Sequence, residues 1–142
     1  MKHAFVFIEV FGCEGGIQSY IQDVLGAYAQ LANRPNDCAD VFLLRDIAGK
    51  HPLKHSPFSY HYFKNEHLWK ERVSFTLAFA TYLVRQRPEH VFCGHINLAG
   101  MVSQLCRLLN IPYTVLTYGK EVWCELPIKD KRALSHAHNI WT

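Results

Sequence analysis

A strand, a glycine-rich loop and a helix follow one another within residues 3–31, and this combination constrains the fold most. Residues 4–11 form an apolar run broken only by Glu9, with the side chains typical of a strand buried on both faces. Three glycines then fall within residues 12–16, where the backbone can adopt torsions that a Cβ would forbid. Apolar residues follow at the spacing of an amphipathic helix: Ile17, Tyr20, Ile21, Val24, Leu25 and Tyr28. A loop at a helix N-terminus presents free N–H groups and the positive end of the helix dipole, which suit an anion.

The glycine pattern itself leaves two interpretations open. It matches neither the GxGxxG fingerprint of dinucleotide-binding domains nor the GxxxxGK[ST] pattern of P-loops. The loop is therefore either a phosphate-binding loop of another type or a plain connection that needs glycine for its shape.

Composition excludes several classes of protein. At 142 residues the chain suits one domain, long enough to bury about two thirds of its unfolded surface. The net charge of +3 is mild and no Lys/Arg run occurs, so no nucleic-acid partner is expected. Five cysteines without a CxxC pair indicate reduced thiols in a cytoplasmic protein. We expect neither a signal peptide nor a membrane-spanning stretch.

Strand and helix patterns alternate along the rest of the chain. Further strands are expected at 40–45, 59–63, 89–94, 113–117 and from 139 onward, and helices at 66–87, 97–109 and 129–137. The helix at 66–87 carries Val73, Leu77, Ala80 and Val84 on one face. Helices that follow apolar strands repeatedly predict an α/β fold with a doubly wound parallel sheet, which is Rossmann-like. The loops 12–16, 94–97 and 117–121 would then meet at the carboxyl edge of the sheet, where such folds bind ligands.

The connection at 46–66 is long and irregular, with several histidines in it. His51, His55, His61 and His67 share no metal-ligand spacing, so no metal site is expected. The aromatic residues at 58–63 could face an acceptor, a lipid surface or the core of the domain itself. The chain ends on an unfinished apolar strand, so we expect a fragment of a longer protein.

Four segments, in order, resemble a known family. GxEGGIQSYIQDV after the first strand, then GHINLAG, IPYTVLTYGKEVW and KRALSHAHNIW, are similar to the N-terminal domain of the family 4 retaining glycosyltransferases of the GT-B fold. The resemblance covers nearly the whole chain and is weakest across 46–66. It implies a single Rossmann-like, acceptor-binding domain at 1–142, with the C-terminal donor-binding domain absent. The whole enzyme would move a sugar from a nucleotide diphosphate sugar to a glycan or lipid-linked acceptor. The resemblance calls for no further cofactor, and such an enzyme works in the cytoplasm, free or attached peripherally to a membrane.

The resemblance also assigns roles near the glycine loop and after the fourth strand. Gly15 and Gly16 resemble the paired glycines that approach the donor's diphosphate. Tyr118 and Gly119 stand where the family has His-Gly, and the family's histidine faces the transferred sugar. Tyr118 is thus the candidate catalytic residue, although a tyrosine cannot become cationic as a histidine can. Glu121 follows as a structural or acceptor-side hydrogen-bonding group.

His95 and Asn97 match the family's loop after the third strand, which faces the cleft and binds the acceptor or sugar. A second interpretation stays open for both residues. His95 could only tie the loop, and Asn97 could only cap a helix beginning at Leu98.

Two other functions remain as alternatives. One is a stand-alone flavodoxin-like or Rossmann-like module that binds a small anionic ligand without catalysis. The other is a Rossmann oxidoreductase in which Asp46 ends the second strand and binds the ribose, although the glycine pattern does not fit it.

Overall fold

Strands and helices alternate along the chain as expected. The computed structural model describes residues 2–11, 15–46, 57–64, 66–119 and 123–142. The strands are β1 (Lys2–Phe7), β2 (Cys38–Leu43), β3 (Phe58–Tyr62), β4 (His90–Cys93), β5 (Tyr113–Leu116) and β6 (Asn139–Trp141). The helices are α1 (Gly16–Leu31), α2 (Leu68–Gln86), α3 (Ile96–Leu108) and α4 (Ile128–His136).

The strands form one parallel sheet with the order β3-β2-β1-β4-β5-β6. The chain winds outward from β1 to β3 and then crosses back to β4 on the other side of β1. This arrangement is the doubly wound, Rossmann-like sheet predicted from the sequence, and it is confirmed. The strand order reverses between β1 and β4, so a crevice is expected at the carboxyl ends of these two strands.

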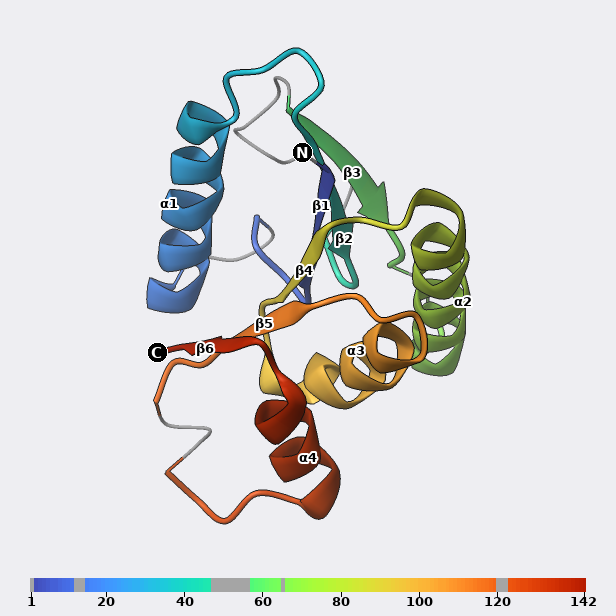
Figure 1. Ribbon diagram of the computed structural model, residues 1–142. Helices are drawn as coiled ribbons and strands as arrows, with labels where there is room; N and C mark the ends of the chain where they lie inside the picture. Colours follow the sequence, from blue (N-terminus) through green and yellow to red (C-terminus); the bar gives the residue numbers. More distant parts are fainter. Residues whose placement is uncertain (1, 12–14, 47–56, 65, 120–122) are drawn as a thin grey trace.

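The sheet is covered by helices on both faces (Figure 1). Helix α1 lies on one face, and α2, α3 and α4 lie on the other. Side chains of β1 alternate between the two cores, because successive residues of a strand point to opposite faces. Ala4 and Val6 pack in the core under α2, α3 and α4, whereas Phe5 and Phe7 pack in the core under α1.

Helix α2 turns a different side to the sheet than the apolar face named above. Val73, Leu77 and Val84 are 49%, 64% and 59% exposed. Another stripe of the same helix is buried instead, with Phe75 and Phe79 in contact with the ring of Phe42 on β2. The helix has two apolar stripes, and the one with the larger aromatic side chains faces the sheet.

The aromatic residues at 58–63 belong to the domain's own core. Phe58, Tyr60 and Tyr62 are half-buried against the core under α1, and Phe63 packs against the opposite core. Of the three surroundings that the sequence left open, the structure therefore favours internal packing. His61 projects from the same strand, and its Nε2 lies 2.8 Å from Asp40 Oδ1.

Candidate functional site at the carboxyl edge of the sheet

The loops after β1, β2, β4 and β5 meet at the carboxyl edge, around the point where the strand order reverses. The strand β1 ends at Phe7, whereas the sequence predicted strand as far as residue 11. Residues 8–11 leave the sheet because their backbone finds other partners. The Leu44 N–H donates to Phe7 O and the Arg45 N–H to Ile8 O, so the segment after β2 follows the chain as it leaves β1.

Asp46 fixes the exit of this first loop. Its carboxylate accepts hydrogen bonds from the Val10 N–H at 2.7 Å and the Phe11 N–H at 2.9 Å. Gln22, on α1, donates from Nε2 to Val10 O. Asp46 is only 1% exposed, so it is not available to bind a ribose as the oxidoreductase alternative requires. In the sequence, the only signal for these hydrogen bonds is an acidic residue directly after a buried strand.

The paired glycines stand at the start of α1, as the phosphate-binding interpretation requires. Gly15 is the N-cap residue, with extended backbone, and Gly16 is the first residue of the helix. Both are exposed. A Cβ on Gly16 would meet nothing within 4 Å, and one on Gly15 would meet only Gln18 Oε1, at 2.6 Å. The fold itself thus leaves the space over Gly16 open. Residues 12–14 of the loop lie outside the described residues.

The loop after β4 is drawn close against β1. Gly94 donates its N–H to Val6 O, and a Cβ at this position would lie 2.0 Å from the ring of Phe7. Only glycine fits there. Directly after it, His95 caps α3, because its Nδ1 accepts a hydrogen bond from the Asn97 N–H at 3.1 Å.

This geometry corrects the structural alternative for Asn97. Helix α3 begins at Ile96, and its cap is His95, so Asn97 lies inside the first turn and is not the cap. The cap by His95 assigns Nδ1 as the acceptor, which leaves Nε2 to carry the proton of the neutral ring. The exposed side chain of Asn97 is therefore free of a capping role.

The loop after β5 braces the two neighbouring loops. Tyr118 donates its hydroxyl to Gly94 O at 2.7 Å, and its ring meets the ring of Tyr20 on α1 edge-on, with centroids 6.1 Å apart. Gly119 has a φ of 102°, a left-handed conformation that strains any residue with a Cβ. Its predicted place in a sugar site thus coincides with a turn that requires glycine. Glu121 lies outside the described residues.

Two pockets open at this edge. The glycine-side pocket has a volume of about 270 Å³, and His95, Asn97 and the first turns of α1 form its wall. Its lining residues are Ile8, Glu9, Ile17, Gln18, Ile21, Arg45, Gly94, His95 and Asn97. The described residues that line it include neither Gly15 and Gly16 nor Tyr118 and Gly119. Tyr118 instead supports the loop that does line it, through its hydrogen bond to Gly94.

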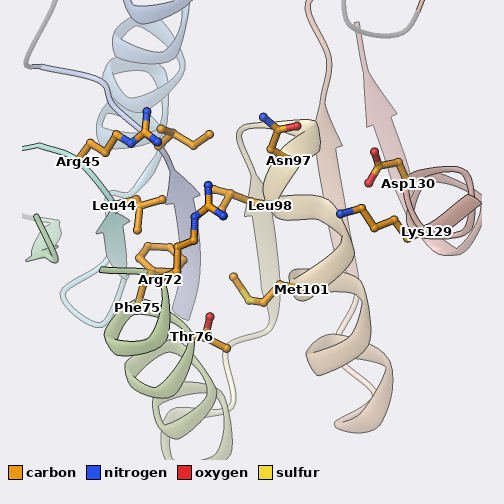
Figure 2. Close-up of a pocket in the computed structure, with 11 residues that line it drawn as sticks. Leu44, Arg45, Arg72, Phe75, Thr76, Asn97, Leu98, Met101, Lys129 and Asp130 are labelled. Atoms are coloured by element: carbon orange, nitrogen blue, oxygen red, sulfur yellow. The ribbon is translucent and has the colours of Figure 1, made fainter. Parts of the chain in front are cut away.

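The second, basic pocket has a volume of about 370 Å³ and lies between α2, α3 and the start of α4 (Figure 2). Its lining residues are Ile8, Leu44, Arg45, Arg72, Phe75, Thr76, Asn97, Leu98, Met101, Lys129 and Asp130. It shares Ile8, Arg45 and Asn97 with the glycine-side pocket, so the two pockets have a common wall. The cations come from separate parts of the chain, and sequence patterns alone do not bring them together.

The histidine, cysteine and acidic side chains of the described residues are further candidates for metal ligands or nucleophiles. Within the described ranges, no three histidine, cysteine or acidic side chains gather as metal ligands would, and His51 and His55 lie outside those ranges. Burial raises the pKa of the Cys93 thiol to about 12, which keeps it protonated and unreactive. None of the described helices is both long enough and apolar enough to cross a bilayer.

Comparison with known proteins supports the fold. No protein-family model and no curated protein matches the sequence. Seven chains of solved structures match, one of them the apo form of the lipopolysaccharide outer core galactosyltransferase WaaB. That match has a TM-score of 0.63 at 16% sequence identity, and it covers 99% of this chain but 38% of the WaaB chain. In fold, the chain is therefore a Rossmann-like α/β domain similar to part of a GT-B glycosyltransferase.

Proposed function

We propose that this chain is the N-terminal, acceptor-binding domain of a retaining glycosyltransferase. The complete enzyme would transfer a sugar from a nucleotide diphosphate sugar to a glycan or lipid-linked acceptor. The observation that carries the proposal is the fold likeness to a galactosyltransferase, together with a pocket at the switch point whose wall includes His95 and Asn97. A donor-binding domain would follow in the same polypeptide, and the enzyme would act in the cytoplasm or at the membrane surface.

The start of α1 supplies the donor side of this proposal. Leaving-group departure places negative charge on the diphosphate, and backbone N–H groups at a helix N-terminus stabilise such charge. Gly15 and Gly16 are exposed, and the space over Gly16 is open. A diphosphate can therefore come closer to the backbone here than it could if side chains were present.

The loops after β4 and β5 supply the sugar side. In the proposed enzyme, the His95 ring and the Asn97 amide bind sugar hydroxyls from the wall of the glycine-side pocket. Tyr118 donates its hydroxyl proton to Gly94 O, and through this bond it would position the loop that carries His95. Because tyrosine does not become cationic, Tyr118 would not neutralise charge. Gly119 holds the turn, and Glu121 is assigned to the acceptor side by resemblance alone.

Retention follows from front-face attack in this proposal. The acceptor hydroxyl attacks the anomeric carbon from the side that the diphosphate leaves, and the departing diphosphate takes up the proton. The acceptor and the departing group must then lie on the same side of the sugar. The common wall of the two pockets provides such neighbouring sites.

The test begins with the reading frame beyond Thr142. We expect it to encode a second doubly wound domain, and the complete protein to consume one member of a panel of UDP- and GDP-sugars in the presence of acceptor glycans. Product analysis by NMR should show the anomeric configuration of the donor retained. A frame that stops within a few codons, or an inverted product, would contradict the proposal.

The alternative of a stand-alone module for a small anionic ligand has one observation in its favour. The basic pocket gathers Arg45, Arg72 and Lys129, which suit a small anion. The same reading-frame experiment separates the two functions, because a lone domain would need no second half. In that case ligand binding by the 142-residue chain would be its whole activity.

A further inference from the structure

The basic pocket concentrates positive charge from three separate elements. Arg45 follows β2, Arg72 lies in the second turn of α2, and Lys129 lies in the first turn of α4. Figure 2 shows Arg72 and Lys129 extending from their two helices toward the space beside the start of α3. Like charges that share a hollow repel one another unless an anion lies between them.

The described residues do not neutralise these cations. Among the described residues, none of Arg45, Arg72 and Lys129 forms an ion pair. The one acid among the described residues of the wall is Asp130, so the lining keeps an excess of positive charge. The starts of α3 and α4 add the positive ends of two helix dipoles to the same hollow.

The rest of the pocket suits a sugar ring that carries such an anion. Ile8 and Met101 are half-buried and offer apolar surface, and the Thr76 hydroxyl and the Asn97 amide offer hydrogen-bonding groups. A volume of about 370 Å³ falls within the range of small-molecule sites. A flat basic surface that binds anions by charge alone would have neither a hollow nor apolar walls.

We propose that the basic pocket binds the acceptor through a phosphate or carboxylate group, with Arg45, Arg72 and Lys129 as its counter-charges. This inference rests on the proposed function, and it names the acceptor class as an anionic sugar. Arg45 and Asn97 belong to both pockets, so an acceptor bound here lies directly beside the sugar to be transferred.

The binding test uses the 142-residue chain and three defined probes. Glucose 6-phosphate, glucose and inorganic phosphate are titrated while NMR follows the Arg45 and Arg72 side-chain Nε–H signals and the Asn97 and Leu98 amides. We expect glucose 6-phosphate to shift these signals, inorganic phosphate to compete, and added salt to weaken both. Equal shifts with glucose, or no shift with either phosphate, would overturn the proposal.

Matched substitutions locate the site. Arg72→Gln and Lys129→Gln should each weaken glucose 6-phosphate binding by about tenfold or more, as expected for losing a charged hydrogen bond. Arg85→Gln removes the same charge from the other end of α2, outside this pocket, and should leave affinity unchanged. If R85Q weakened binding as much as R72Q, the effect would be general electrostatics and the proposal would fail.

A further arm distinguishes two sources of the phosphate. Vesicles of phosphatidylcholine are compared with vesicles that also contain phosphatidylinositol phosphate, and retention on the latter is measured for R72Q and R85Q. Retention lost only in R72Q identifies a membrane-linked phosphosugar, whereas glucose 6-phosphate binding without retention identifies a soluble one; both support the anionic pocket. These binding tests are independent of the transfer assay on the complete protein. Phosphate binding without any sugar transfer by the complete protein would therefore reject the proposed function and keep the anion-binding pocket.

Discussion

At the scale of single residues, Asp46 couples the second strand to the loop that leaves the first. We expect Asp46→Ala to lower the free energy of unfolding by about 2–4 kcal/mol, because two buried backbone N–H groups lose a charged acceptor. Urea denaturation measures this. Asp46→Asn keeps one acceptor oxygen, so its free energy of unfolding should lie between those of the unchanged protein and D46A. If D46A were as stable as the unchanged protein, the two hydrogen bonds to Asp46 would contribute nothing to the free energy of unfolding.

His90 gives the fold a dependence on pH. Burial, together with the nearby His138 and His3, lowers the pKa of His90 to about 4. In the unfolded chain His90 has a pKa near the ordinary 6.5, so between about pH 6.5 and 4 it binds a proton that it does not bind in the folded chain. The free energy of unfolding should therefore be undiminished above about pH 6.5 and fall as the pH drops toward 4.

The variant His90→Gln tests this origin. It cannot titrate, yet it keeps a group able to bond to Thr114 Oγ1, which lies 2.7 Å from His90 Nε2. Urea denaturation across this pH window should give a flatter profile for H90Q. Some slope should stay, because burial also lowers the pKa of His3. A profile as steep as that of the unchanged protein would place the dependence elsewhere.

At the scale of elements, Tyr113 holds α4 against the rest of the domain. Its hydroxyl, on β5, donates to Ala133 O on α4 and lies 2.9 Å from Ser103 Oγ on α3. Tyr113 is 1% exposed, so Tyr113→Phe leaves a buried carbonyl without its donor. We expect a loss of about 1–3 kcal/mol of unfolding free energy by thermal or urea denaturation. Tyr20→Phe removes an exposed hydroxyl and should change stability by less than about 0.5 kcal/mol.

Elements were easier to predict from the sequence than faces or partners. Apolar runs and period-3.6 patterns located the strands and helices of the described residues, because burial on a parallel sheet leaves long apolar runs and clear helical stripes. The predicted buried face of α2 was wrong because the helix carries two apolar stripes. Which stripe is buried depends on how the side chains of each fit against the sheet, and the sequence pattern does not show this fit. The cap of α3 was displaced by two residues, since a histidine ring nitrogen acts there in place of the expected asparagine side chain.

The candidate site could be predicted only where its residues follow a strand directly. His95 and Asn97 follow the end of β4, and the paired glycines begin the helix that follows β1, so topology alone brings them to one edge. The basic pocket could not be found this way. Arg72 and Lys129 lie within helices, and their meeting depends on how α2 and α4 pack around α3.

At the scale of the whole molecule, one glycine substitution should weaken ligand binding without lowering stability. Gly16→Ala places a methyl group in open space at the start of α1, so the melting temperature should not fall. In the complete protein, the same methyl group should raise the Kd for the nucleotide sugar by tenfold or more, because it keeps the diphosphate from the backbone.

Gly26→Ala, inside α1, is the control for that experiment. It also meets open space, and it should raise the free energy of unfolding by about 0.5–1 kcal/mol without affecting the donor. Calorimetry with UDP- and GDP-sugars measures both effects. If G16A bound the donor as well as G26A does, the glycine loop would have no part in diphosphate recognition.

The central position of β1 also determines when the domain can form during synthesis. This strand is made before both of its neighbours in the sheet, and its register pairs His3 with Ala39 on one side and with His90 on the other. Its second edge and much of its apolar surface have no neighbour until the ribosome has released β4. Contacts between residues so distant in sequence slow folding and prolong the exposure of aggregation-prone apolar surface. A nascent chain arrested before Cys93 should therefore be a chaperone substrate, and one extended past Trp141 should be released from that dependence.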